Sequence, residues 1–203
     1  MKTGIRLNPG SKIFIIAALA LIISPITAFA QTSKTEAFFK IFASGTYHMK
    51  ARMSGGDGMT ADMESYVRGG NMASTISAQG QTTRMIFKDN KMHMIMDSMK
   101  MIMITPMMDK SQAGGIETAN MKPTGSGTAR FAGKSLPYEE YSDPQGNKTQ
   151  YFLDGDKLVG IRSIIGREGT VDIEILTLDQ NVPNNVFDIP SGYQVQDMSG
   201  FGL

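Results

Sequence analysis

The chain has 203 residues, of which 41% are hydrophobic and 19% are charged, and its formal net charge at pH 7 is +1. It contains no Cys, which excludes disulfides, thiolate metal sites and cysteine nucleophiles. The near-neutral charge provides no broad basic field of the kind that binds nucleic acid. We therefore expect one globular domain of ordinary size with no nucleic-acid partner.

Residues 1–30 have the layout of a secretory signal peptide. A basic start with three Lys or Arg precedes the apolar run 13–23 (IFIIAALALII), and residues 28–30 (AFA) form a small-x-small cleavage site. A membrane-spanning helix needs about 20 apolar residues, so this run is too short for an anchor. We expect cleavage after Ala30 and a periplasmic or secreted mature chain that does not span the membrane.

The mature chain is predicted to be mostly strands. Residues 31–44 are expected to form a linker with a short helix at 35–43, for which Ser33 is the candidate N-cap. From residue 45 onward, apolar and polar residues alternate with a period of two, and turn signals recur every eight to twelve residues. This pattern is typical of an antiparallel sheet with one buried face. Strands are predicted at residues 45–53, 59–68, 71–78, 81–88, 128–132, 136–142, 148–153, 157–165 and 170–178, with a hairpin at 91–105.

Three other segments complete the predicted chain. Residues 105–127 are rich in Gly and Pro and are expected to be a connection that crosses or covers the sheet, with a helical piece at 107–112. Phe187 and Ile189 are expected to close one end of the sheet. Residues 45–193 would form a single domain, and residues 194–203 a flexible tail.

Methionine is unusually frequent in the first six predicted strands, and it recurs with strand parity. In the hairpin, Met92, Met94 and Met96 share one parity, so they lie on one face of their strand. If Asp97-Ser98 forms a two-residue turn, Met99, Met101 and Met103 lie opposite them on the same face. Earlier strands continue the pattern, and the candidate ligand-binding residues are Met49, Met63, Met72, Met85, Phe87, Met92, Met94, Met96, Met99, Met101 and Met103.

Three interpretations of this face remain open. The first is a filled core, in which case the protein could be a structural component of the cell envelope. The second is a pliable apolar cavity for acyl chains or lipidated partners, because the flexible methionine side chain adapts to many apolar shapes. The third is a site for Cu(I) or Ag(I), since thioethers are soft ligands. Met94, Met96, Met99 and Met101 are the candidate metal ligands.

The sequence offers little for catalysis. Only His48 and His93 could act as an imidazole base, and both are predicted to be solvated on strand faces. Glu139 and Glu140 are adjacent, so on a strand they point to opposite sides and cannot act as a pair. We expect a protein that is not an enzyme and that carries no cofactor.

Two parts of the chain resemble known families. Residues 66–70, 84–97 and 99–105 look like the middle of the outer-membrane lipoprotein carrier superfamily. Residues 132–141, 150–153, 158–161 and 187–193 are similar to a family of uncharacterised secreted bacterial domains that ends in a Phe-x-Ile-Pro-x-Gly-Tyr motif, here FDIPSGY. The resemblance implies a mainly β fold with minor α, in which a curved antiparallel sheet forms an incomplete barrel around one or two short helices. It also implies an apolar interior that binds lipid or a lipid-modified protein.

Overall fold

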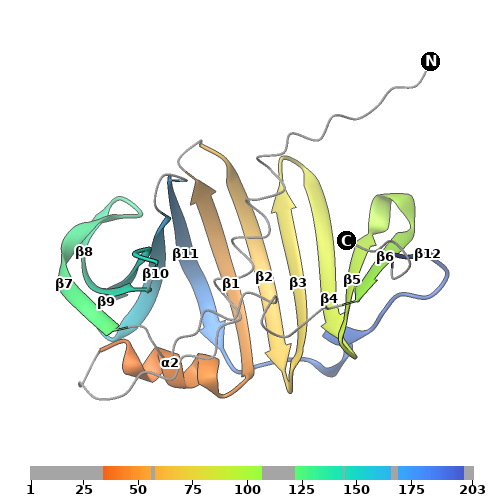
Figure 1. Ribbon diagram of the computed structural model, residues 1–203, viewed down its shortest axis with the longest axis horizontal. Helices are drawn as coiled ribbons and strands as arrows, with labels where there is room; N and C mark the ends of the chain where they lie inside the picture. Colours follow the sequence, from red (N-terminus) through yellow and green to blue (C-terminus); the bar gives the residue numbers. More distant parts are fainter. Residues whose placement is uncertain (1–33, 56–57, 107–121, 144, 166–168, 199–203) are drawn as a thin grey trace.

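The computed structural model describes residues 34–55, 58–106, 122–143, 145–165 and 169–198. All strands in these ranges belong to one sheet of twelve, in the order β12-β6-β5-β4-β3-β2-β1-β11-β10-β9-β8-β7. Figure 1 shows the sheet face on, with β7 at one end and β12 at the other. The sheet is curved and does not close, which confirms the predicted mainly β fold with an incomplete barrel.

Most strands that lie side by side in the sheet are also consecutive in the chain; the exceptions are the pairs β1–β11 and β12–β6. Neighbouring strands are antiparallel except for the parallel pair β12–β6. The first half comprises α2 (Glu36–Ala43), β1 (Thr46–Gly55), β2 (Thr60–Arg68), β3 (Asn71–Ala78), β4 (Gln81–Lys88), β5 (Lys91–Met96), η1 (Asp97–Met99) and β6 (Met101–Pro106). The second half comprises β7 (Lys122–Phe131), β8 (Lys134–Ser142), β9 (Lys148–Asp154), β10 (Lys157–Ile165), β11 (Gly169–Asp179), η3 (Asn184–Phe187) and β12 (Gln194–Asp197).

Two-residue turns connect β2 to β3, β3 to β4 and β4 to β5. Gly69 and Gly70 have φ values of 56° and 82°, and Asp89 and Asn90 have φ values of 53° and 58°. Two consecutive positive φ angles are the signature of the hairpin turn whose twist matches that of the strands. The predicted strand ends at residues 68, 71, 88 and 91, which leave two residues for each of these turns, are confirmed.

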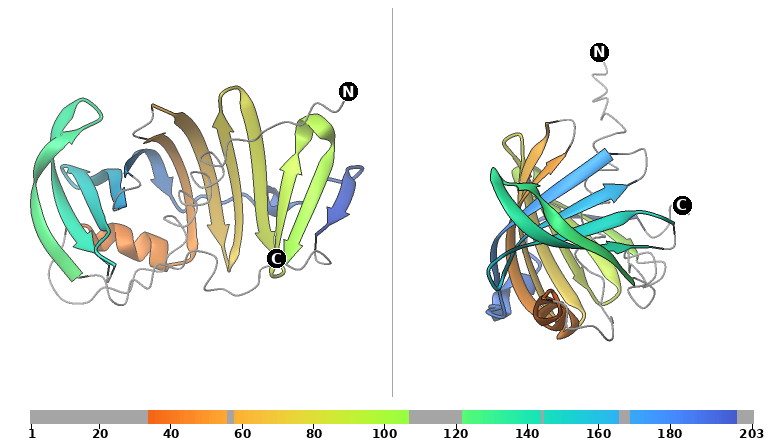
Figure 2. Two further views of the ribbon diagram at one scale, coloured as in Figure 1. Left: turned by 45° about the horizontal axis from the view of Figure 1, so that its top comes forward. Right: turned by 90° about the vertical axis from the view of Figure 1, so that its left-hand side faces the viewer.

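Helix α2 lies where the sheet curls most strongly, at the end that carries β8 and β9 (Figure 2). Phe39 of α2 contacts Tyr141 and Tyr151 edge to face, with ring centroids 5.5 and 5.1 Å apart. The N-cap is Thr35, whose hydroxyl donates to Glu139 Oε2 at 2.7 Å instead of capping the helix. Ser33, the predicted cap, lies outside the described residues. The helix therefore fills the curl and ties the start of the described chain to β8.

Residues 180–193, which we call the C-terminal segment, run from β11 across the sheet to β12 (blue in Figure 1). Val182 and Phe187 pack against Ala73, Ile86 and Ile95 in a second hydrophobic core. Phe187 thus covers a face of the sheet and does not close its end, while Ile189 is 39% exposed and takes no part in that core.

Two boundary predictions are wrong. Residues 194–197 are not a loose tail, because they form β12 and pair in register with residues 101–104 of β6. Residues 122–127 are not part of a connection, because β7 begins at Lys122 and pairs with β8. The predicted signal peptide, the helix predicted at 107–112 and residues 199–203 lie outside the described residues. Within the described ranges, no helix has the length and apolar character that crossing a bilayer requires.

Candidate functional site

The strand register places the predicted methionines, except Met99, on one side of the sheet. We call the side that carries Met49, Met63 and Met85 the inner face. Residues that pair directly on neighbouring strands point to the same side. One continuous row of such pairs crosses β1 to β6 and consists of Met49, Ser65, Ser74, Met85, Met94 and Met103. A second row on this face consists of Val67, Met72, Phe87, Met92 and Thr105.

Burial along the inner face changes from one end to the other. On β1 to β4, Met49, Met63, Met72 and Met85 are each 4% exposed or less and belong to the main hydrophobic core together with Phe39 of α2. On β5 and β6 the methionines are only half-buried. We call these five residues the methionine strip: Met92, Met94, Met96, Met101 and Met103. The inner face is therefore a filled core at one end and a partly open apolar surface at the other.

Met99 is the one predicted site residue that is not on this face. The hairpin turn contains the 3-10 helix η1 and then Lys100, whose φ is 47°, so four residues and not two connect β5 to β6. Met96 consequently pairs with Met101, and Met94 pairs with Met103. Met99 is 60% exposed in the turn. The strip still lies on the predicted face, because the observed register differs from the predicted one by two residues, which is an even number.

The opposite side of the same strands, the outer face, is built differently. Ile86, Ile95 and Ile102 are at most 3% exposed there, beneath the C-terminal segment. His93 lies among them and is 7% exposed, and its Nδ1 is 3.2 Å from the carbonyl oxygen of Ile86. The prediction that His93 is a solvated surface residue is therefore wrong, because the segment that covers it comes from the distant end of the chain.

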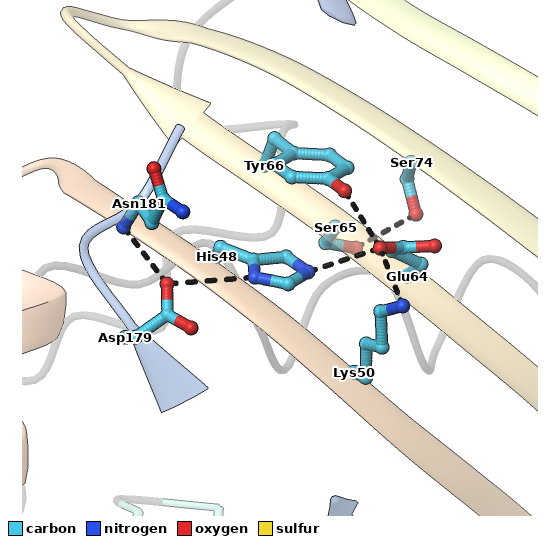
Figure 3. A network of polar contacts seen from close by, with 8 residues as sticks. All are labelled: His48, Lys50, Glu64, Ser65, Tyr66, Ser74, Asp179 and Asn181. Carbon is cyan, nitrogen blue, oxygen red and sulfur yellow. Dashed lines mark hydrogen bonds and ion pairs between the residues drawn. The ribbon is translucent and has the colours of Figure 1, made fainter. Parts of the chain in front are cut away.

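His48 belongs to a polar network on the outer face of β11, β1 and β2 (Figure 3). Its Nε2 is 3.0 Å from Glu64 Oε1, and its Nδ1 is 3.5 Å from Asp179 Oδ1. The imidazole ring stacks on Tyr66 with centroids 4.5 Å apart, and the His48 side chain is only 12% exposed. The prediction of a solvated histidine is wrong here as well. Both ring nitrogens face carboxylates, so the ring holds three strands together.

The Glu64 carboxylate accepts hydrogen bonds from three side chains in this network. Burial raises its pKa, but hydrogen bonds from the Tyr66 hydroxyl at 2.6 Å, from Lys50 and from His48 outweigh burial and lower the pKa overall. The same hydrogen bond to Glu64, together with burial, raises the pKa of Tyr66 to about 12. Sequence parity alone could reveal the Lys50–Glu64 pair, which lies in direct register on β1 and β2. It could not reveal Asp179, which arrives through the β1–β11 pairing.

A small pocket lies on the outer face, between β2–β4 and the C-terminal segment. Its volume is about 170 Å³, whereas pockets for drug-sized ligands measure about 300–1,000 Å³. It is too small for an acyl chain and does not coincide with the methionine strip. Its lining residues include Tyr66, Thr75, Arg84, Ile86, Asn185 and Val186.

No group of three or more His, Asp or Glu side chains within the described ranges is arranged to hold a metal ion. Asp and Glu side chains of the described sheet contact basic side chains instead, such as Asp172 with Arg162 and Glu140 with Lys148. The described residues therefore offer a metal only the methionine sulfurs, which we consider below.

Comparisons with known proteins support the fold but do not identify a family. No protein-family model matches the chain, and no curated protein matches it in sequence. An uncharacterised conserved protein from Thermus thermophilus has a similar structure, with a TM-score of 0.53, 9% identity, and coverage of 81% of this chain and 99% of that one. A LolA superfamily protein from Nitrosomonas europaea aligns with a TM-score of 0.43 and 11% identity over 80% of this chain and 99% of that one. The first likeness shows a shared fold, and membership in the lipoprotein carrier superfamily stays a prediction.

Proposed function

We propose that this is an exported, non-enzymatic protein that binds a lipid or the acyl chains of a lipid-modified protein on the methionine strip, as a carrier or chaperone. The observation that carries the proposal is the change in burial along the inner face. Met49 and Met85 are sealed in the core, whereas the five methionines of the strip keep part of their surface accessible. Contiguous apolar surface on a soluble domain is a common mark of a binding site.

The choice of residue type supports an adaptable surface. Methionine has three flexible torsions, so a row of methionines fits acyl chains of different length and shape. The predicted signal peptide and the resemblance to the lipoprotein carriers point in the same direction. A structural envelope protein with a filled core is the main competitor, and the filled part of the inner face at β1–β4 is compatible with it. The two ideas differ in whether the strip binds a ligand.

Photocrosslinking tests the proposal directly. We expect a palmitic acid analogue with a diazirine group to label natively purified protein within β5 and β6. The variant Met94→Glu/Met103→Glu, which places two charges on the strip, should weaken palmitate binding at least about tenfold. Met99→Glu is the matched control, because it adds the same charge in the exposed turn of the same hairpin and should leave binding unchanged.

Two results would contradict this function. One is protein that binds no palmitate and yields no lipid when it is extracted with organic solvent and examined by mass spectrometry. The other is a Met99→Glu variant that loses as much binding as the double variant. Thermal unfolding of all three proteins separates loss of binding from loss of the fold.

A further inference from the structure

Both faces of β4–β6 carry large apolar side chains, but of different types. The outer face buries Ile86, Ile95 and Ile102 beneath the C-terminal segment. On β5 and β6, the inner face carries methionine at every position except Thr105, and β4 adds Met85 between Thr83 and Phe87. Isoleucine has the higher strand propensity and the better-defined rotamers, so packing alone would favour it on both faces. The difference indicates that the inner face uses a property that isoleucine lacks, either flexibility or sulfur.

Four of the thioethers form a compact group. Met94 pairs directly with Met103, and Met96 pairs directly with Met101. Directly opposed residues have Cβ atoms about 4.5–5.5 Å apart, and alternate residues along a strand are about 7 Å apart. The long methionine side chain spans these separations, so four sulfurs can converge above the centre of the group. Met85, which pairs with Met94, adds a fifth sulfur at the margin.

The surroundings of these sulfurs are uncharged. The remaining inner-face neighbours on β4, β6 and β12 are Thr83, Phe87, Thr105, Gln194 and Gln196. The charged residues of β4 and β5 point to the other side, because Arg84 pairs with Ile95, and Lys88 with Lys91. On β4, β5, β6 and β12, the inner face therefore offers no cation to repel a metal and no carboxylate to attract a hard one.

We propose that Met94, Met96, Met101 and Met103 form a thioether site for a soft monovalent cation, Cu(I) or Ag(I). Thioethers favour such ions, whereas Zn²⁺ and Mg²⁺ prefer nitrogen, thiolate or oxygen ligands. Thioethers carry no proton to lose, so binding should persist at mildly acidic pH, unlike binding at a histidine or cysteine site. This inference goes beyond lipid binding, since it depends on sulfur and not on apolar area.

Methyl NMR with ¹³C-methyl-methionine gives a readout for each residue. Titration of the purified protein with Ag(I) should shift the methyl signals of the four methionines, saturate at one equivalent, and leave Met99 unchanged. Zn²⁺ should shift none of them. Anaerobic competition with bicinchoninate then measures Cu(I) affinity, and Met94→Leu/Met103→Leu should lower it at least about tenfold. Met99→Leu, in the same hairpin, is the matched control and should bind as the wild type does.

Leucine keeps the apolar volume and removes the sulfur, so this variant also separates the two proposals. We expect it to retain palmitate binding while it loses Cu(I). The metal site is overturned if Ag(I) shifts none of the four signals, if the double leucine variant binds Cu(I) as tightly as the wild type, or if Met99→Leu weakens binding equally. None of these outcomes bears on lipid binding, which fails only in the palmitate experiment.

Discussion

Gly160 on β10 is a residue at which side-chain volume is tightly limited. A Cβ atom at this position would lie 2.1 Å from Cε1 of Phe131. The Phe131 ring has little freedom to move, because it stacks on Phe152 at 4.4 Å and lies 5.7 Å from the guanidinium of Arg162. We expect Gly160→Ala to lower the free energy of unfolding by about 1–3 kcal/mol, as overpacking of a filled site does. Urea denaturation measures this change.

Gly125 on β7 is the control for this substitution, since a Cβ there would meet nothing within 4 Å. Gly125→Ala should therefore unfold near the wild-type urea midpoint, or slightly above it, because alanine reduces the freedom of the unfolded chain. Equal midpoints for wild type and Gly160→Ala would show that Phe131 can move aside, and would contradict the argument.

At the scale of elements, Phe187 is the most deeply buried aromatic side chain of the C-terminal segment. Phe187 is 7% exposed and packs in the outer-face core, and the segment continues into β12 beside β6. We expect Phe187→Ala to destabilise the protein by about 3–5 kcal/mol, as truncation of a buried core phenylalanine does. The backbone amides of Gln194 and Met198 donate to the carbonyl oxygens of Lys100 and Ile104. In Phe187→Ala, hydrogen exchange should show that these two amides lose protection early.

Ile189 provides the comparison within the same segment. It is 39% exposed and lies outside the outer-face core, so Ile189→Ala should change stability by less than about 1 kcal/mol. If both variants lowered stability equally, burial of Phe187 in the outer-face core would not be what holds the segment to the sheet. Retained protection at Gln194 in Phe187→Ala would show that β12 is held mainly by its own backbone pairing.

The hairpins of β2–β5 could be predicted because their information is local. Gly-Gly and Asp-Asn turns favour positive φ, and the period of two assigns each side chain to a face. The β5–β6 turn was missed by two residues, since Lys100 adopts a positive φ without any sequence signal for it. The C-terminal segment and β12 could not be predicted, because parallel pairing of β12 with β6 joins distant parts of the chain and depends on tertiary packing.

At the scale of the whole molecule, strand register decides which predicted site residues share a face, and tertiary packing decides how deeply each is buried. The register error is an even number of residues, so the methionine strip lies on the predicted face even though Met101 takes the place opposite Met96 that was expected for Met99. The position of a residue along a strand predicts the face on which its side chain lies, but not how deeply that side chain is buried. The sealing of Met49 and Met63 depends on α2 and on the curl of β8 and β9, and the burial of His93 depends on the C-terminal segment. The sequence therefore indicates which side chains share a face, and tertiary structure decides which of them a ligand can reach.

That difference in depth predicts the order in which the described methionines oxidise. Hydrogen peroxide converts methionine to its sulfoxide at a rate that follows exposure. We expect Met99, at 60% exposure, to react first, the methionine strip next, and Met49, Met53 and Met63, each at most 2% exposed, last. Tandem mass spectrometry over a time course resolves the individual sulfoxides. Palmitate should slow oxidation of the strip and leave Met99 unaffected, because only the strip would be covered. Sulfoxide formation at Met49 as rapid as at Met94 would contradict the burial gradient on which the lipid-binding proposal rests.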